Sequence, residues 1–219
     1  SLPPKERKFL WSLIDTQDEG EIIAELHDEI QQELISEISA EELITILGDL
    51  ELDEIVDILQ VLPDRKTENI LSAMSMRDRK RIREALEYPE DSAGGLMNTD
   101  IISVRPKHNL EVVMRYLRAQ RELPKNTDQI FVVSRENKFL GSLPISTIIV
   151  SDPNLNVREL METETQPLLV DLNDKDVSRL FEQNDWVSAP VIDKESNLIG
   201  RITMDDVVDV IMEDADQNF

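Results

Sequence analysis

The ten residues Tyr88-Pro-Glu-Asp-Ser-Ala-Gly-Gly-Leu-Met97 separate two parts of the chain that follow different hydrophobic patterns. Pro89 and the pair Gly94-Gly95 interrupt a helical register, because proline lacks a backbone N–H and glycine loses much conformational entropy in a helix. Apolar residues recur with a helical period before this stretch and form short β-branched runs after it. The sequence therefore predicts a helical domain over residues 1–88 and a mixed region beyond it.

The helical part repeats an apolar pattern about every 12 residues between positions 39 and 88. The aligned apolar positions are Leu43, Ile46, Leu47 and Leu50, then Ile55, Ile58, Leu59 and Leu62, then Ile70, Leu71 and Met74. Ser39 with Glu42 three residues later predicts a capped helix start, Asp53 and Asp64 predict two more, and Pro63 ends the helix before it. Short antiparallel helices that pack mainly on their neighbours would form a helical-repeat array.

An internal repeat organises the mixed part. Val132-Val133 aligns with Val191-Ile192, and Phe139-Leu140-Gly141 aligns with Leu198-Ile199-Gly200, both at an offset of 59 residues. The preceding helices align at an offset of 64, which places a five-residue insertion in the first copy around residues 121–127. Each copy reads strand, helix, strand, tight turn, strand, helix, and the two are expected to pack through their sheets. Duplication for stability and a ligand cleft between the copies both remain open.

The expected fold class is α+β multidomain, with an all-α helical-repeat domain followed by a tandem pair of α+β units. The expected boundaries are 1–88 for the helical domain, 89–153 and 154–212 for the two units, and 213–219 for the start of a further helix.

Composition limits the function. The 219 residues include 46 Asp and Glu against 23 Lys and Arg, a net charge of -23, and phosphate backbones would repel such a chain, so we expect no nucleic-acid partner. There is no Cys, which excludes disulfides and thiolate metal sites. No apolar run approaches the roughly 18 to 20 residues that cross a bilayer, so we expect this part of the protein to be soluble and cytosolic.

The acidic residues are unevenly distributed. No Lys or Arg lies between Lys8 and Arg65, and none follows Arg201. Solubility explains much of such a surface, but like charges on a helix destabilise it, so a dense cluster also indicates a cation or a basic partner.

The sequence does not indicate an enzyme. It contains no Gly-x-x-x-x-Gly-Lys, Gly-x-Ser-x-Gly or His-Glu-x-x-His motif. His27 and His108 are isolated in the sequence, and we expect both at the surface.

The paired units resemble cystathionine-β-synthase (CBS) domains, since the second copy ends in Gly200-x-x-Thr203-x-x-Asp206 before a helix. The order of parts resembles the cytosolic region of MgtE-type magnesium transporters: an acidic helical domain, the stretch Tyr88 to Met97, two CBS copies and an acidic helix. The resemblance implies a homodimer through the CBS domains, at the cytoplasmic face of the membrane, continuing into a transmembrane pore domain. It also implies that bound Mg²⁺ bridges the acidic helical and CBS domains and favours the closed pore.

Carried over by position, the resemblance implies metal ligands in both parts of the chain. These are Glu21 and Asp53 in the helical domain, Asp185, Asp206 and Asp209 in the CBS pair, and the backbone of Gly95. Mg²⁺ prefers such hard oxygen donors. As an alternative to metal binding, Asp53 could be an N-cap, and Asp185 could have no role beyond ending a helix. Gln217 and Asn218 stand where the family leads us to expect carboxylates.

The resemblance also leaves an alternative, because CBS pairs often bind ATP or related adenosine ligands. Asp206 would hold the ribose, and Trp186 could stack on the adenine. In the first copy the positions equivalent to Thr203 and Asp206 are Pro144 and Thr147, so the motif is incomplete there.

Overall fold

The computed structural model describes residues 10–11, 13–14, 19–24, 26, 28–48, 50–120 and 122–217, and the side chains of these except 21, 28, 29, 37, 40, 209 and 213–217. The chain forms two compact units, Ser1–Glu87 and Tyr88–Phe219, so the boundary lies one residue before the expected one. Within the described ranges, no helix combines the length and the apolar character that crossing a bilayer requires.

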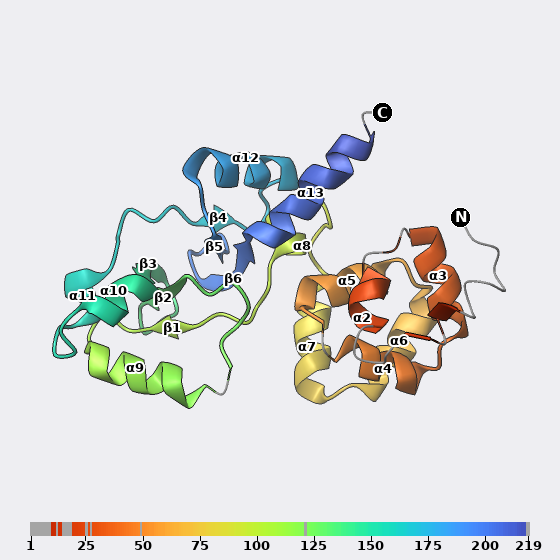
Figure 1. The fold of residues 1–219 in the computed structure, drawn as a ribbon, viewed down its shortest axis with the longest axis horizontal. Helices are drawn as coiled ribbons and strands as arrows, with labels where there is room; N and C mark the ends of the chain where they lie inside the picture. Colours follow the sequence, from red (N-terminus) through yellow and green to blue (C-terminus); the bar gives the residue numbers. More distant parts are fainter. Residues whose placement is uncertain are drawn as a thin grey trace. The chain divides into compact units, whose positions relative to one another are not determined.

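The described residues of the first unit form helices joined by short turns (Figure 1). The helices are α2 (Glu19–Ala24), α3 (Asp28–Glu37), α4 (Ala40–Leu47), α5 (Leu52–Gln60), α6 (Asp64–Ala73) and α7 (Met76–Ala85). α4, α5 and α6 carry the three aligned sets of the 12-residue pattern, and α7 lies within the range 39–88 that the pattern was expected to cover. α4 packs on α6 and α5 packs on α7, so alternate helices stack, where the sequence led us to expect packing mainly between neighbours.

One apolar core holds this unit together, with a fully or almost fully buried side chain from every helix from α2 to α7. These include Ile23, Ile35, Leu43, Leu59, Ile70 and Ile82. Full burial of such a side chain stabilises the fold by about 1.5–3 kcal/mol relative to exposure. The apolar face that the sequence pattern predicts on each helix therefore forms the buried core of this unit.

Two of the three predicted helix caps need correction. Ser39 is the N-cap of α4, and its hydroxyl accepts the backbone N–H of Glu42 at 3.2 Å, as predicted. Asp64 is not an N-cap, because Pro63 takes that position and Asp64 is the first residue of α6. Proline fits there because its fixed φ suits the residue before a helix and the cap needs no N–H of its own.

Asp53 is not an N-cap either. The N-cap of α5 is Glu51, and Asp53 is the second residue of the helix. The carboxylate of Glu54 accepts the backbone N–H of Glu51 at 2.7 Å, and Leu52 is buried, so the helix begins earlier than an Asp cap would place it. Asp53 and Glu54 then lie in the first turn, where the helix dipole stabilises negative charge.

The second unit contains the two copies that the repeat predicts. Its elements are α8 (Ala93–Leu96), β1 (Ser103–Val104), α9 (Leu110–Ala119), β2 (Gln129–Val133), β3 (Phe139–Pro144), α10 (Ile145–Val150), α11 (Val157–Leu160), β4 (Leu168–Leu169), α12 (Asp174–Asn184), β5 (Ser188–Ile192), β6 (Leu198–Thr203) and α13 (Met204–Gln217). The expected boundary between residues 212 and 213 falls inside α13, so the helix continues across it.

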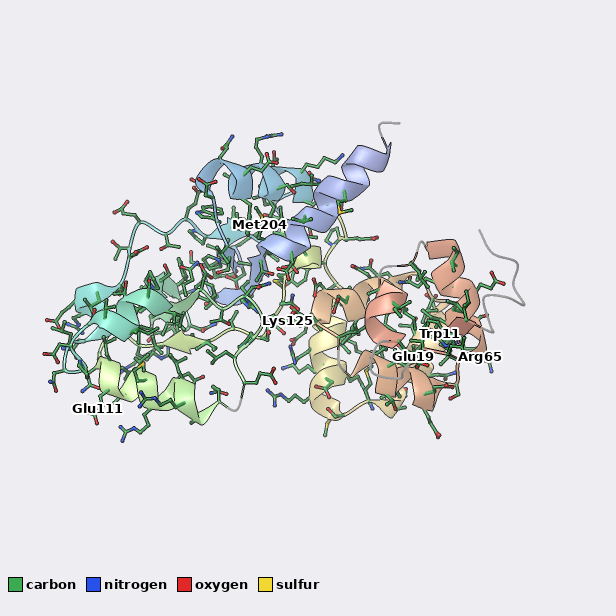
Figure 2. All side chains as sticks on the ribbon, in the orientation of Figure 1. Trp11, Glu19, Arg65, Glu111, Lys125 and Met204 are labelled. Atoms are coloured by element: carbon green, nitrogen blue, oxygen red, sulfur yellow. The ribbon has the colours of Figure 1, made fainter. Side chains whose placement is uncertain are left out.

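The two sheets have the same topology. Their strand orders are β1-β2-β3 and β4-β5-β6, with a parallel first pair and an antiparallel second pair. The strands β2 and β3 match β5 and β6 at the offset of 59, and α9 matches α12 at the offset of 64, as the sequence predicts. In Figure 2, Glu111 projects from α9 on the outside of the first copy, and Lys125 lies in the loop that carries the insertion.

The copies exchange their leading segments. The backbone N–H of Ala93 and of Gly94 in α8 donate to Leu172 and Val170 of the second copy, and Ala93 is part of that copy's core. Likewise the segment before β4 packs on the first copy, where Glu162 exchanges backbone hydrogen bonds with Ser142. The sequence boundaries at 89 and 154 therefore do not coincide with the packing boundary of each core.

The hairpin turns of the two copies bond to one another. The backbone N–H of Phe139 donates to Ser196 at 2.9 Å, and that of Leu198 donates to Asn137 at 3.0 Å. Phe131 and Leu198 from the two sheets share one small buried cluster. The two copies thus pack as one body, and their matching strand starts face a common cleft.

Candidate functional site

A cleft of about 600 Å³ lies between the two copies of the second unit. Its walls come from the start of β2, the end of β3, the connector before β4, and the segment from the end of α12 into β5. The lining residues are Asp128, Gln129, Pro144, Glu162, Thr163, Glu164, Thr165, Gln166, Asn184, Asp185, Trp186, Val187, Ser188, Ala189 and Pro190. A volume of this size suits a ligand of drug or nucleotide dimensions.

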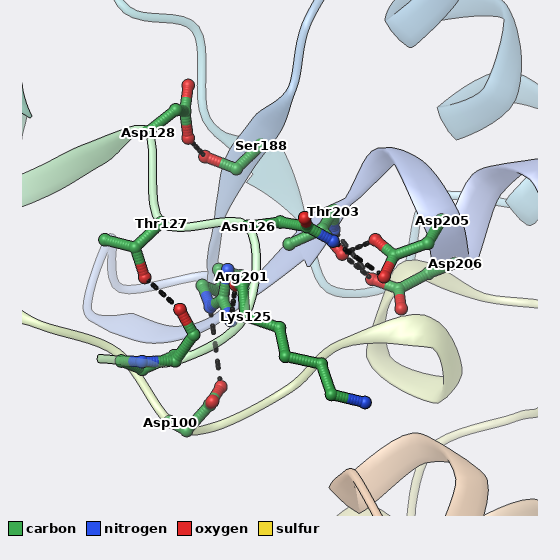
Figure 3. Close-up of polar contacts among 11 residues, drawn as sticks. Asp100, Lys125, Asn126, Thr127, Asp128, Ser188, Arg201, Thr203, Asp205 and Asp206 are labelled. Atoms are coloured by element: carbon green, nitrogen blue, oxygen red, sulfur yellow. Dashed lines mark hydrogen bonds and ion pairs between the residues drawn. The ribbon is translucent and has the colours of Figure 1, made fainter. Parts of the chain in front are cut away.

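The first residues of β2 and β5 join the two halves of the cleft. The side-chain amide of Gln129 donates to the carbonyl oxygen of Ser188 at 3.0 Å and to its hydroxyl at 3.2 Å. That hydroxyl donates in turn to the carboxylate of Asp128, and Ser188 is only 4% exposed (Figure 3). These bonds fix the relative position of the two strand starts, so this part of the cleft is preorganised.

Trp186 and Asp185 follow directly after α12. Asp185 caps the helix with φ 52° and ψ 41°, a left-handed conformation, and its backbone N–H donates to Phe181. Trp186 is half-buried and meets the ring of Phe181 edge-on, with 5.6 Å between centroids. Asp185 therefore does end a helix, and the turn that it forms directs Trp186 against the second core while both residues line the cleft.

Asp206 lies at the start of α13 and is not among the residues that line the cleft. Its carboxylate accepts the backbone N–H of Thr203 at 2.6 Å and the hydroxyl of Thr203 at 3.0 Å (Figure 3). Thr203 is 1% exposed. The Gly200-x-x-Thr203-x-x-Asp206 motif therefore also has a structural role, because it closes the turn from β6 into α13.

The insertion of the first copy reaches across to the second. The guanidinium of Arg201, 4% exposed, donates to the carbonyl oxygen of Lys125 at 2.8 Å and contacts Asp100 at 3.4 Å. The side chain of Asn126 donates to Asp205 at 2.8 Å (Figure 3). The loop is thereby held beside the start of α13, where the carboxylates of Asp205 and Asp206 lie.

Close packing explains why α8 has glycine at two positions, without any ligand. A Cβ on Gly95 would lie 2.5 Å from the backbone oxygen of Glu90 and 2.6 Å from that of Pro89. One on Gly94 would lie 2.6 Å from the ring of Tyr88. The close approach of backbone to backbone therefore requires glycine at position 95, whatever its carbonyl oxygen binds.

Within each unit, the predicted residues lie on elements that pack on one another or share the cleft. Asp185 and Trp186 share the cleft, while Asp206 and Asp209 lie on α13, which packs on α12. Glu21 is on α2 and Asp53 on α5, two helices of the first unit that pack on each other. The side chains of Glu21 and Asp209 lie outside the described part.

Sequence reasoning missed most polar residues of the cleft, among them Asp128, Gln129, Glu162 and Glu164. The strand starts could have been found, because Gln129 and Ser188 occupy equivalent positions at the offset of 59. The connector residues had no such signal.

The residues that the resemblance implies as ligands have the chemistry that Mg²⁺ prefers, since Asp53, Asp185 and Asp206 are carboxylates and Gly95 has a backbone carbonyl oxygen. Mg²⁺ binds such hard oxygen ligands and commonly takes only one or two carboxylates from the protein.

Family comparisons agree with this division of the chain. Residues 1–91 match the model of the MgtE intracellular N domain, and residues 93–153 and 157–213 match the model of the CBS domain. Magnesium transporter MgtE of Thermus thermophilus is 31% identical over 151 residues, which are 69% of this chain and 34% of that protein. The Bacillus subtilis magnesium transporter MgtE is 26% identical over 68% of this chain and 33% of its own length. The chain spans about a third of the length of these relatives.

Two solved structures are similar over almost the whole chain. The cytosolic domain of the Mg²⁺ channel MgtE in complex with ATP superimposes with a TM-score of 0.88 at 30% identity, covering 95% of this chain and 86% of that one. The soluble part of a magnesium transporter superimposes with a TM-score of 0.84 at 23% identity, covering 98% of this chain and 84% of that one, and shows the same fold.

Proposed function

The chain belongs to the MgtE family, as an intracellular N domain joined to a pair of CBS domains, and on this premise we propose that it is the cytosolic Mg²⁺-sensing region of a magnesium transporter. The observation that carries the proposal is the distribution of charge. The base-free stretch between Lys8 and Arg65 belongs to the N domain, and the base-free stretch after Arg201 belongs to the CBS pair.

The two acidic regions make the approach of the domains depend on cations. Two like charges about 4 Å apart repel by roughly 1–4 kcal/mol, depending on the effective dielectric constant. Divalent ions between the domains replace this repulsion by attraction. Mg²⁺ therefore bridges the N domain and the CBS domains, and the bridged arrangement favours the closed state of the pore.

We assign the bridging ligands to the positions that the family resemblance implies. Glu21 and Asp53 serve from the N domain, and the CBS side contributes Asp185, Asp206, Asp209 and the carbonyl oxygen of Gly95. Asp206 and Asp209 are three residues apart on α13, a spacing that places them on adjoining parts of one helix face. The cap that Asp206 makes to Thr203 is compatible with ligation, because a carboxylate offers about four lone-pair positions.

The proposal extends to the whole protein. The region forms a homodimer through its CBS domains and continues from α13 into a transmembrane pore domain, at the cytoplasmic face of the cell membrane. The relatives are transporters, and we assign the chain a regulatory role and no catalytic one.

Small-angle scattering tests the Mg²⁺ response. We expect millimolar Mg²⁺ to lower the radius of gyration, and we expect the double variant Asp53→Asn with Asp206→Asn to lose most of that change, because one ligand is removed from each domain. The control is Asp64→Asn with Glu182→Gln, which removes the same charge from exposed positions in the same two units. A wild-type radius that does not respond to Mg²⁺ would refute the proposal, and a normal response of the first double variant would refute the ligand assignment alone.

A second candidate function is the binding of an adenine nucleotide or related adenosine ligand in the cleft of the CBS pair. It is favoured by the 600 Å³ cleft with Trp186 in its wall and by the 30% identical MgtE cytosolic domain that was crystallised with ATP. The ribose role predicted for Asp206 finds no support in this cleft, because Asp206 does not line it.

A further inference from the structure

The first turn of α13 carries two adjacent carboxylates, Asp205 and Asp206. The backbone N–H of Thr203 donates to Asp206 at 2.6 Å. The hydroxyl of Thr203 lies within hydrogen-bond reach of both carboxylates, with 3.0 Å to that of Asp206. A hydroxyl carries one proton, so it donates to only one of them at a time. The two neighbouring carboxylates therefore compete for this hydroxyl.

Asn126 supplies a donor to one side of the competition. Its side-chain amide donates to the carboxylate of Asp205 at 2.8 Å, from the loop between α9 and β2 of the first copy (Figure 3). Because Asp205 then has a donor of its own, the hydroxyl of Thr203 is left for Asp206. One neutral side chain of the first copy thus decides how the donors are shared in the second copy.

The loop is held where Asn126 can reach α13. The buried guanidinium of Arg201 donates to the carbonyl oxygen of Lys125, the residue before Asn126, at 2.8 Å. Asn126 itself has φ 52°, a left-handed conformation that asparagine adopts more readily than most residues. Both the backbone and the side chain of residue 126 are therefore fixed by specific interactions.

The other half of the CBS pair differs at both partners of this contact. At the offset of 59, Ser146 and Thr147 of α10 stand where α13 has Asp205 and Asp206. The loop before β5 consists of residues 185–187 alone, whereas nine residues precede β2. The longer loop and the acidic pair therefore occur together, which favours a function for the contact over a general requirement of the CBS fold.

We infer that Asn126 is a positioning residue for the Mg²⁺ response, because it binds Asp205 and so reserves the donors of Thr203 for Asp206. The inference rests on the proposed function, which assigns Asp206 to Mg²⁺. Hydrogen bonds around a metal ligand orient it, and their loss typically lowers metal affinity by roughly 10- to 100-fold. Asn126 acts through Asp205 and does not itself bind the ion.

A Mg²⁺ titration of the full chain, followed by small-angle scattering, tests the inference. The measured quantity is the Mg²⁺ concentration at half of the change in radius of gyration, called the midpoint below. Asn126→Gly removes the amide and keeps the left-handed backbone, which glycine adopts without strain. We expect its midpoint to lie about tenfold above that of the wild type.

The matched control is Asn137→Gly. Asn137 also has a left-handed backbone, with φ 65°, and its side chain also donates from the first copy to the second. Its acceptor is the carbonyl oxygen of Leu198 at 2.8 Å, and not a carboxylate of α13. We expect the control to have the wild-type midpoint. Equal midpoints for the two glycine variants would overturn the inference.

A double-mutant cycle separates positioning from a general structural role. In Asp205→Ala the amide of Asn126 has lost its acceptor, so adding Asn126→Gly should shift the midpoint by a further factor of about two at most. A further tenfold shift in that background would show that Asn126 does not act through Asp205, and the inference would be wrong.

The outcomes also separate the inference from the function on which it rests. A wild-type chain that does not become more compact with Mg²⁺ would refute the proposed function and the inference together. A wild-type chain that responds, with an unshifted midpoint in Asn126→Gly, would refute the inference alone.

Discussion

Asp193 and Ser134 occupy equivalent positions in the hairpin turns of the two CBS copies. In the second copy the carboxylate of Asp193 accepts the backbone N–H of Glu195 at 3.0 Å and that of Asn197 at 2.8 Å. In the first copy the hydroxyl of Ser134 accepts the corresponding N–H groups two and four residues later, at 3.1 and 3.2 Å. One turn geometry is therefore stabilised by an ionisable group in one copy and by a neutral group in the other.

This difference predicts a pH dependence. Burial raises the pKa of the Asp193 carboxyl, but hydrogen bonds from the side chain and backbone of Asn197 and the backbone of Glu195 outweigh it, so the pKa lies below its ordinary value of 3.8. A folded-state pKa that is depressed stabilises the fold above the unfolded-state pKa, and the gain disappears as the pH falls through the folded-state value. We expect Asp193→Asn to lower the free energy of unfolding of the CBS unit by about 1 kcal/mol at pH 7 and by progressively less below pH 3.8.

Urea unfolding at a series of pH values measures this. Glu195→Gln is the control, because it removes an exposed charge from the same turn. A deficit of Asp193→Asn that stays constant down to the acid limit of folding would show that the carboxylate charge does not contribute.

At the level of elements, the loop between α9 and β2 distinguishes the two copies. Nine residues separate these elements, whereas only residues 185–187 separate α12 from β5. The longer loop is attached to the second copy through Arg201 and Asp205. An insertion in one copy thus stabilises the association of both.

Removing the anchor should release the loop. Arg201→Ala leaves the Lys125 carbonyl oxygen and the Asp100 carboxylate without the guanidinium, and hydrogen bonds to charged groups contribute about 1.5–3 kcal/mol each. We therefore expect at least tenfold faster hydrogen exchange of the backbone amides in residues 122–128, measured by mass spectrometry. Arg158→Ala, at an exposed arginine of the same unit, should leave that exchange unchanged. Equal protection of the loop in Arg201→Ala and wild type would contradict the assignment.

Periodicity predicted the helices and strands because it depends only on which face of each element is buried. The offsets of 59 and 64 correctly placed the strands, the helices and the insertion. The helix starts at Leu52 and Asp64 were missed, because each depends on a local competition that Glu54 and Pro63 decide.

The candidate site was predicted only in part for a different reason. Asp185 and Trp186 lie next to a helix end that the pattern locates, but Glu162 and Glu164 lie in a connector without periodicity. Their place in the cleft follows from the exchange of leading segments between the copies, which depends on tertiary contacts such as the backbone bonds between Glu162 and Ser142.

For the whole molecule, the two base-free stretches of the chain lie in different units. Each unit has its own apolar core, so neither needs the other to bury its hydrophobic residues. Under the proposed function, the acidic surfaces of the two units repel each other, and this repulsion acts between the units while each core holds its own unit together.

This division yields a prediction for the isolated CBS pair. A fragment of residues 88–219 contains all of the second unit, including α8 and its contacts with the second copy, so we expect it to unfold cooperatively. Because the fragment lacks Glu21 and Asp53, its radius of gyration should not respond to millimolar Mg²⁺, while the full chain becomes more compact. Binding of an adenine nucleotide, the second candidate function, should be retained, since every residue that lines the cleft is present. Scattering and titration on the same preparation measure both properties, and a fragment that compacts with Mg²⁺ as the full chain does would show that the ions act within the CBS pair and not between the domains.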